Sequence, residues 1–296
     1  ELLRKENSQF IIALGGGSTM DLSKAASVAA RTGKSITFYH GTGEALPSEG
    51  IPLIAVPTTS GTGSEVTGVA VLTDKDKKLK APIGVAKALY ARIALIDYEL
   101  TYSVPARITA GTGIDVLSHA VEGYWSIGHQ PVCDAMAVHA IKNVFGYLEK
   151  ACTEPDNEEA RCKMAEASVI AGLAFSLPKT TSSHACSFPL TQIYHIPHGE
   201  ACGLTLDYFI RYNSKHDEDG RINALVKTLG FSNGDEFADA VASLKETIGT
   251  RCDLKDLEIT EEALDDLVKR SRHPNLLNNP CEISDEVLYD MYRGMI

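Results

Sequence analysis

The pattern of apolar residues changes near Pro105, and this change restricts the possible folds more than any other feature. Before it lie short continuous apolar runs, which are typical of buried parallel strands. After it, apolar residues recur with helical spacing over 106–125, 131–149, 157–175, 199–212, 234–248, 260–271 and 284–293. The sequence therefore predicts an α/β domain over residues 1–105 and an all-helical domain over 106–296. Prolines are expected at helix breaks or starts, at positions Pro131, Pro155, Pro178, Pro189 and Pro280.

A glycine-rich turn follows the first predicted strand. The apolar run 10–14 leads into Gly15, Gly16, Gly17 and Ser18, and a helix is expected over 21–30. A strand, a glycine turn and a helix start together present free N–H groups and the positive end of the helix dipole to a phosphate. A glycine triplet alone is a weak signal, because it more often marks a simple turn.

A second strand candidate, 52–56, ends in a loop over 57–65 that carries five hydroxyl side chains. Ligands of open α/β sheets bind at the carboxyl ends of strands, so two such loops strengthen the case for a nucleotide site. A polar surface loop is the alternative. The lysine-rich segment 77–80 is by default a solvated turn, although one lysine could reach a phosphate or a ribose. The residues predicted to bind the cofactor are Gly16, Gly17, Ser18, Asp21, Thr58, Thr59, Thr62 and Lys80.

Asp115 and His119 form half of a candidate metal site. They lie four residues apart in an apolar, helical segment, so both side chains project from one face. His184 and His198 could complete a cage of one carboxylate and three imidazoles. Such an Asp–His pair is commonly an ordinary helical pair, and a lone histidine is usually structural. A buried carboxylate and imidazole in so apolar a segment nevertheless need partners.

Composition excludes several classes of function. The 296 residues carry a net charge of −11, which argues against nucleic acid and anionic membranes as partners. The seven cysteines form no CxxC pair, which indicates reduced thiols in a cytoplasmic protein. No apolar run approaches the roughly 18 residues of a membrane span, and no signal peptide opens the chain. The first residue is not Met, so we expect that an upstream segment is missing.

Taken together, these motifs resemble the iron-containing (group III) alcohol dehydrogenase family. The matching segments are GGGSTMDLSK at 15–24, PTTSGTGSEVT at 57–67, ARITAGTGIDVLSHAVEGY at 106–124 and the stretch 184–199, in the family's order. The resemblance implies a dehydroquinate synthase-like fold, in which a Rossmann-like nucleotide-binding domain packs on an all-α metal-binding domain. It further implies a homodimer that uses NAD or NADP and a divalent metal, Fe²⁺ by family or alternatively Zn²⁺. The implied ligands, which also form the catalytic centre, are Asp115, His119, His184 and His198.

The sequence departs from the family's pattern in two respects. Family members have strands and a helix before the GGGS strand, and the residue that selects NAD or NADP lies there. The sequence therefore leaves that choice open. The family often has a second histidine four residues after the third ligand, where this chain has Phe188. We expect Phe188 to line the substrate pocket close to the metal and the nicotinamide, and the alternative is a core aromatic beneath the metal helix.

The predicted reaction is hydride transfer between a short primary alcohol, or its aldehyde, and the nicotinamide. A divalent ion would make the alcohol more acidic and polarise the aldehyde carbonyl. Cys186, close to His184, could be a fifth ligand, but a small packed side chain is the preferred interpretation.

Other functions on this scaffold stay open at this point. The segments SSHACSFPL and IPHGEACGLTL weakly resemble phosphonoacetaldehyde reductases. Glycerol dehydrogenase-like polyol oxidation and dehydroquinate synthase are further alternatives. The resemblance implies that their metal sites lack a histidine at the position of His119, which argues against both. The alternative from another class is a non-catalytic nucleotide-binding protein with a structural metal.

Overall fold

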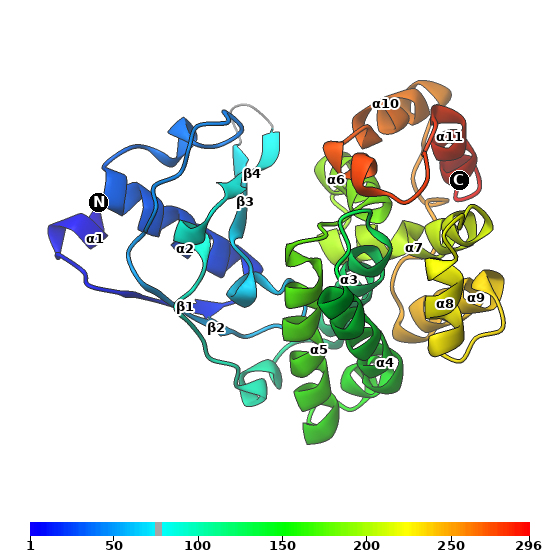
Figure 1. The fold of residues 1–296 in the computed structure, drawn as a ribbon, viewed down its shortest axis with the longest axis horizontal. Coiled ribbons are helices and arrows are strands. Elements are labelled where there is room, and N and C mark those ends of the chain that lie inside the picture. The colour runs from blue at the N-terminus through cyan, green and yellow to red at the C-terminus, as the bar shows by residue number, and fades with distance from the viewer. Residues whose placement is uncertain (75–78) are drawn as a thin grey trace.

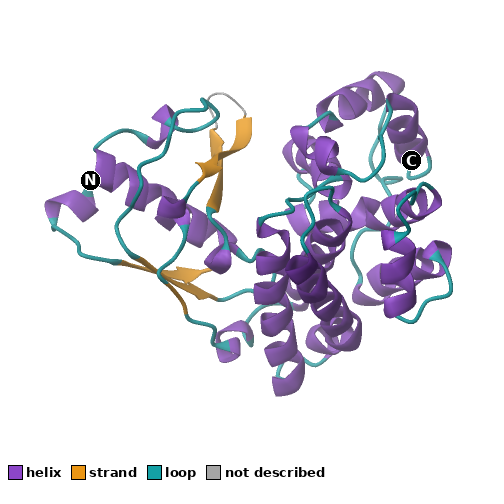
Figure 2. Ribbon diagram, viewed as in Figure 1, coloured by secondary structure: helices purple, strands orange, loops and turns teal. Residues whose placement is uncertain are grey.

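The computed structural model describes residues 1–74 and 79–296. A smaller part with strands lies beside a larger part made of helices (Figures 1 and 2). The first part contains α1 (Leu2–Lys5), β1 (Ile11–Gly15), α2 (Gly17–Thr32), β2 (Leu53–Pro57), β3 (Val69–Asp74), β4 (Leu79–Val85) and β5 (Ile93–Ala94). Its 3₁₀ turns are η1 (Ile36–Phe38), η2 (Ser64–Val66), η3 (Lys87–Leu89) and η4 (Tyr98–Thr101).

Strands β1, β2 and β5 form a parallel sheet in the order β1-β2-β5. Side chains alternate across a strand, so Ala13 of β1 and Ala55 of β2 face inward and pack with Met20 of α2. Ile12 and Leu14 point the other way and are 59% and 57% exposed. The parallel pairing brings the carboxyl ends of β1 and β2 to the same edge of the sheet, which places the two predicted cofactor loops side by side.

Strands β3 and β4 form a separate antiparallel pair. Helix α2 packs against β3, and its buried Lys24 donates hydrogen bonds from Nζ to the carbonyls of Thr67 and Val69 at 2.9 and 2.8 Å. Strand β3 begins at Val69, three residues after η2 ends at Val66.

The second part contains α3 (Ala106–Trp125), α4 (Pro131–Thr153), α5 (Glu158–Ser176), α6 (Ser182–Tyr194), α7 (His198–Lys215), α8 (Arg221–Thr228), α9 (Gly234–Ile248), α10 (Glu261–Ser271), η5 (Pro274–Asn278) and α11 (Asp285–Arg293). Helix α3 is its central element, and Ile114, Leu117 and Val121 are fully buried in one large apolar cluster. Within the described residues, no helix is both long enough and apolar enough to cross a membrane.

The helical periodicity locates most of these helices within a few residues, but the predicted ranges leave out α6 and α8. The expectation for Pro189 is wrong, because this residue lies inside α6 and not at a break. A proline inside a helix removes one hydrogen bond and costs about 3 kcal/mol. Burial of Cys186 and Leu190 in the apolar cluster offsets this cost, and α6 continues to Tyr194. Helix α8 is too short, at eight residues, to show clear periodicity.

The 57–65 loop contacts α5 of the helical part at two points. The N–H of Gly61, in the 57–65 loop, donates to Ser168 Oγ on α5 at 2.8 Å. A Cβ added to Gly63 would lie 2.5 Å from Gly172 Cα, so the loop and α5 touch through bare backbone. These contacts hold the end of β2 against the helical part. The predicted domain boundary at residue 105 stays an interpretation of the change in element type just before α3.

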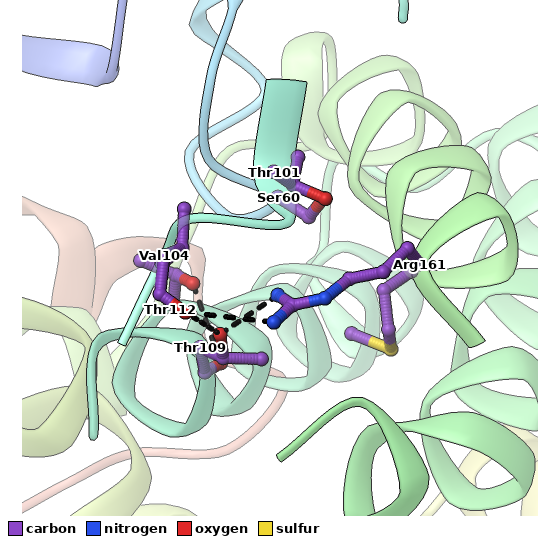
Figure 3. A pocket seen from close by; sticks show the side chains of 7 residues that line it. Ser60, Thr101, Val104, Thr109, Thr112 and Arg161 are labelled. Carbon is purple, nitrogen blue, oxygen red and sulfur yellow. Dashed lines mark hydrogen bonds between the residues drawn. The ribbon is translucent and has the colours of Figure 1, made fainter. Parts of the chain in front are cut away.

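Arg161 of α5 fastens the segment that enters α3 (Figure 3). Its guanidinium is buried and donates to Thr109 Oγ1 at 2.9 Å, to the Val104 carbonyl at 3.4 Å and to the Pro155 carbonyl at 2.8 Å. Arg161 and Thr109 line a small cavity, and Ser60 of the 57–65 loop lines it as well (Figure 3). The start of α3, which carries Asp115 further along, is therefore fixed relative to α5 and the 57–65 loop.

Candidate metal centre and cofactor loops

Four side chains from three helices converge in the helical part. Asp115 of α3, His184 of α6, and His198 and Cys202 of α7 each offer one donor atom, and these atoms all lie within 4.8 Å of one another. Asp115 Oδ1 is 3.6 Å from His184 Nε2, and Cys202 Sγ is 3.8 Å from His198 Nε2. Three of the four predicted ligands are thus brought together, and Cys202 joins them.

The convergence depends on a close crossing of α3 and α7. A Cβ on Gly199 would lie 2.0 Å from the Gly111 carbonyl oxygen, and one on Gly203 would lie 2.6 Å from Ile114 Cγ1. Glycine at both positions lets the two backbones approach, which brings the face of α7 with His198 next to Asp115.

His119 stands at the edge of this cluster. Its Nδ1 is 3.9 Å from Asp115 Oδ1, and its ring stacks on Phe175 at 4.2 Å and lies 4.6 Å from the ring of His184. Burial lowers the pKa of His119 to about 4, although Asp115 acts in the opposite direction. The ring is therefore neutral near pH 7, as a metal ligand must be. His119 is not among the side chains gathered within 4.8 Å, and its role as a ligand stays a prediction.

Glu122 orients His184, a role that the sequence analysis missed. Its carboxylate is fully buried, and Oε1 accepts hydrogen bonds from Thr181 Oγ1 at 2.9 Å, from the Ser183 N–H at 2.6 Å and from the His184 N–H at 3.3 Å. Oε2 pairs with His184 Nδ1. A carboxylate can only accept, so Nδ1 carries the proton and the Nε2 lone pair faces the cluster. The available signal was the position of Glu122, seven residues after Asp115 and therefore on the same helix face.

The donor set fits a divalent transition metal. It combines a carboxylate, imidazoles and a thiol, which are the groups that bind such ions in proteins. His184 Nε2 is buried and lies 3.6 Å from Asp115 Oδ1. A ring nitrogen beside a buried carboxylate favours a cation between them, so these residues fit a divalent metal.

The two cofactor loops touch each other. The Thr58 N–H donates to the Gly15 carbonyl at 3.1 Å, and Cβ atoms added to Gly16 and Gly17 would lie 3.3 Å from Thr59 Oγ1 and 2.6 Å from Thr62 Cγ2. A side chain at Gly17 would collide with Thr62, so this close approach depends on glycine there. Helix α2 begins at Gly17, four residues before the predicted start.

The first hydrogen bonds of α2 are donated by Thr19 and Met20 to the Gly16 carbonyl. The N–H groups of Gly17 and Ser18 precede these bonds, and they are left to serve a ligand at the helix start.

The structure does not connect Asp21 or Lys80 with a cofactor. The Asp21 carboxylate accepts from Ser64 Oγ at 2.7 Å and from the Val71 N–H at 2.9 Å, so it ties α2 to the loop and to β3. Lys80 pairs with Thr73 in the β3–β4 ladder, but its side chain lies outside the described part of the chain. Lys77 and Lys78 lie outside the described residues altogether. A cofactor role for Asp21 and Lys80 stays a prediction.

Phe188 lies beside the metal cluster and is half-buried. Its ring is 6.3 Å from that of His198 and 4.4 Å from that of His273, a residue that the sequence analysis did not single out. Cys186 faces away from the cluster. Its thiol hydrogen-bonds to Tyr292 and Ser271, and burial raises its pKa to about 12. That position suits a packed side chain and not a fifth ligand.

Comparison with known proteins identifies relatives along nearly the whole chain. Residues 1–98 match the family model described as iron-containing alcohol dehydrogenase, and residues 109–296 match the C-terminal model of the Fe-containing alcohol dehydrogenase family. The long-chain-alcohol dehydrogenase 1 of Geobacillus thermodenitrificans is 42% identical over 204 residues, which is 68% of this chain and 51% of that protein. The 1-propanol dehydrogenase of Salmonella typhimurium is 38% identical over 85% of this chain and 65% of its own length.

Among solved structures, the sulfoacetaldehyde reductase from Bifidobacterium kashiwanohense in complex with NAD⁺ superposes with a TM-score of 0.96. It is 59% identical, and the match covers 99% of this chain and 78% of that one. An alcohol dehydrogenase from Oenococcus oeni superposes with a TM-score of 0.92 at 32% identity, over 100% of this chain and 79% of that one. The chain thus spans between half and four fifths of the length of these relatives.

Proposed function

This chain belongs to the iron-containing alcohol dehydrogenase family, and from that membership we propose that it transfers hydride between a nicotinamide cofactor and a short aldehyde or its primary alcohol. The observation that carries the proposal is the donor set of buried Asp115 and His184 with half-buried His198. The 57–65 loop reaches the edge of this set, because the Gly61 backbone hydrogen-bonds to His119, whose ring lies 4.6 Å from that of His184. A metal centre and a cofactor loop in contact are what such a reaction requires.

The chain's own side chains have distinct parts in this proposal. Asp115, His119, His184 and His198 would hold a divalent ion, Fe²⁺ by family or Zn²⁺ as the alternative, and the ion supplies Lewis acidity at the carbonyl when bound. Glu122 keeps the proton of His184 on Nδ1 and so leaves Nε2 as a ligand.

The two cofactor loops and Phe188 would form the part of the site that holds the cofactor and the substrate. The N–H groups of Gly17 and Ser18 would bind the pyrophosphate, and Thr58, Thr59 and Thr62 would lie toward the ribose and the nicotinamide. Phe188, whose ring lies 6.3 Å from that of His198, would offer an apolar wall that limits the access of water to the reacting carbonyl.

We propose an anionic two-carbon aldehyde as the first substrate class to test, with sulfoacetaldehyde as its probe. The support is the 59% identity to a sulfoacetaldehyde reductase over 99% of this chain, and the NAD⁺ in that complex favours NAD as the cofactor. The second candidate is a plain short aldehyde, which the 38% identity to a 1-propanol dehydrogenase supports.

The test is NADH and NADPH oxidation by the metal-loaded protein, with sulfoacetaldehyde and propionaldehyde assayed separately. We expect turnover that a chelator abolishes and added Fe²⁺ or Zn²⁺ restores. His198→Ala should lower metal occupancy and activity together. Oxidation of neither nucleotide with either aldehyde, or activity that survives metal removal, would refute the proposal. Full metal occupancy in His198→Ala would remove that residue from the ligands.

We also propose a cytoplasmic setting and a homodimer. The setting is supported by the seven cysteines, which are all free thiols. Sedimentation of the purified protein tests the dimer, and a single species at the monomer mass of 31.9 kDa would contradict it.

A further inference from the structure

A cavity of about 770 Å³ lies at the amino ends of the three parallel strands. Its lining includes Gln9 just before β1, Ile51 and Pro52 just before β2, and Arg92 just before β5. The cofactor loops follow the carboxyl ends of β1 and β2, and the length of β1 separates the two edges by roughly 15 Å. Figure 1 shows α1, which also lines the cavity, at the end of the molecule away from the helical part. The cavity is therefore distinct from the cofactor loops and from the metal centre.

The lining of this cavity is positively charged, although the chain as a whole is acidic. Glu49 is the only carboxylate among the described residues of the lining. The cations are Arg4 in α1, Arg31 in the last turn of α2, Lys87 in η3 and Arg92. Four positive charges against one negative charge give the lining a net charge of +3, whereas the chain carries −11. All four cationic side chains are exposed, so an anion can reach them from solvent.

The arginines of the cavity differ from the other arginines of the chain, because they have no partner. All arginines lie in the described part of the chain. Those whose guanidinium donates hydrogen bonds are Arg107, Arg161, Arg211, Arg221, Arg251, Arg270, Arg272 and Arg293. The remaining three, Arg4, Arg31 and Arg92, make no side-chain hydrogen bond or ion pair with any described residue. All three line this one cavity.

Exposure to solvent does not explain why these three arginines lack partners. The side chains of Arg107, Arg270 and Arg293 are 76%, 53% and 57% exposed, and each still pairs with a carboxylate. An exposed arginine of this acidic chain thus normally finds an acidic neighbour. The arginines around the cavity are the exception, which leaves their hydrogen-bond donors available to a ligand.

The dipole of α2 explains only part of the arrangement. Cations are favoured at the carboxyl end of a helix, where Arg31 lies. Arg4 is close to the same end, because a Cβ on Gly33 would lie 3.1 Å from its Nη1. Lys87 and Arg92 belong to η3 and to the start of β5, so the dipole of α2 gives no reason for their place in the lining.

We propose that this cavity binds a small molecule that carries two phosphate groups. A guanidinium donates two parallel hydrogen bonds to a phosphate, which makes arginine the preferred side chain for this group. Each phosphate carries about 1.5 to 2 negative charges at pH 7, so two carry roughly 3 to 4 and match the lining. A single phosphate would leave the lining positive. The volume of about 770 Å³ falls within the range of about 300–1,000 Å³ that is typical of small-molecule sites.

The experiment is calorimetric titration of inorganic pyrophosphate into the intact chain, with and without saturating NADH. The protein is stripped of metal, because pyrophosphate also binds divalent ions. NADH blocks the start of α2 at Gly17, where pyrophosphate could otherwise bind. We expect one pyrophosphate per chain in both conditions. Arg31→Gln and Arg92→Gln should each raise its dissociation constant about tenfold, because each removes hydrogen bonds between charged groups.

Arg293→Gln is the matched control. It removes the same charge from an exposed arginine, but this arginine lies on α11 and pairs with Glu261. The control should bind pyrophosphate like the wild type. Arg92→Lys keeps the charge but loses the two-pronged hydrogen bond, so its affinity should lie between those of the wild type and Arg92→Gln. Arg31 and Arg92 have no partner to lose, so thermal unfolding of their variants should match that of the wild type.

Several results would overturn the proposal. They are no binding of pyrophosphate, unchanged affinity in both Arg31→Gln and Arg92→Gln, or an equal loss of affinity in Arg293→Gln. Orthophosphate that binds as tightly as pyrophosphate would also refute a site for two phosphate groups. Displacement of pyrophosphate by NADH would assign it to the cofactor loops instead. The proposed hydride transfer needs none of these arginines, so the aldehyde assay and this titration can fail independently.

Discussion

Glu122→Gln is the substitution that should separate metal binding from folding most cleanly. The amide oxygen can keep the place of Oε1 and accept from Thr181 and Ser183. The amide NH₂ then faces His184 Nδ1, which pairs with Oε2 in the wild type. Two donors cannot share a hydrogen bond, so the proton of His184 moves to Nε2. A protonated Nε2 is unable to bind a metal.

The size of the effect follows from this competition. To bind metal, the variant must return the proton to Nδ1 and leave a buried donor against a donor, which costs about 1–3 kcal/mol. Since 1.4 kcal/mol is tenfold, the metal dissociation constant should rise about tenfold to a hundredfold. The metal-free fold should change much less, because the neutral amide avoids the cost of burying a charge.

The assay is competition for Zn²⁺ with a chromophoric chelator, together with thermal unfolding of the metal-free protein. Glu166→Gln is the matched control, because Glu166 also pairs with an imidazole, His139 Nε2 at 2.5 Å, but on the protein surface. The control should bind zinc like the wild type. An unchanged zinc affinity in Glu122→Gln would refute the tautomer argument. A loss of affinity that only accompanies a collapse of the metal-free fold would show that Glu122 is merely structural.

Three further predictions concern other parts of the chain. Gly17→Ala places a Cβ 2.6 Å from Thr62 Cγ2, so NADH titrated by fluorescence should bind more weakly, whereas Gly146→Ala, with nothing within 4 Å, should not change it. Phe188→His should fold normally and alter the pH dependence of turnover, and an unchanged profile would exclude this position from proton transfer. Burial lowers the pKa of Lys24 from 10.5 to about 8, although Asp21 acts in the opposite direction. Between these pH values the unfolded chain holds more protons, so the free energy of unfolding should rise with pH, by up to about 1.4 kcal/mol per unit. Lys24→Met should lack this rise in denaturant titrations at pH 8 and 10, and equal slopes would contradict the reasoning.

The sequence was sufficient for those features that depend on local pattern. Helix α3 was predicted at the bounds it has, 106–125, because its apolar positions recur without interruption. Helix α6 was not among the predicted ranges, since Pro189 argues against a helix and only tertiary burial overrides that preference. Local pattern contains no information on such burial.

The candidate site was only partly predictable for a similar reason. Asp115, His184 and His198 are of residue types that commonly bind metals, and their donor atoms lie within 4.8 Å of one another in the structure. Cys202 has the same four-residue spacing to His198 that drew attention to Asp115 and His119, but a single cysteine among seven gives no signal by itself. The role of Glu122 depends on where α6 begins, because it accepts from the N–H groups of Ser183 and His184 at that helix start.

The contact between Gly63 and Gly172 has a consequence for how this fold can vary. The 57–65 loop is bounded on one side by Gly16 and Gly17 and on the other by α5. A segment confined on both sides has no room for an inserted residue, and any side chain larger than hydrogen at Gly63 would force the two parts of the molecule apart. Changes of loop length among relatives should therefore occur elsewhere, and an engineer who wishes to enlarge the substrate space should begin at Phe188 and leave this loop intact.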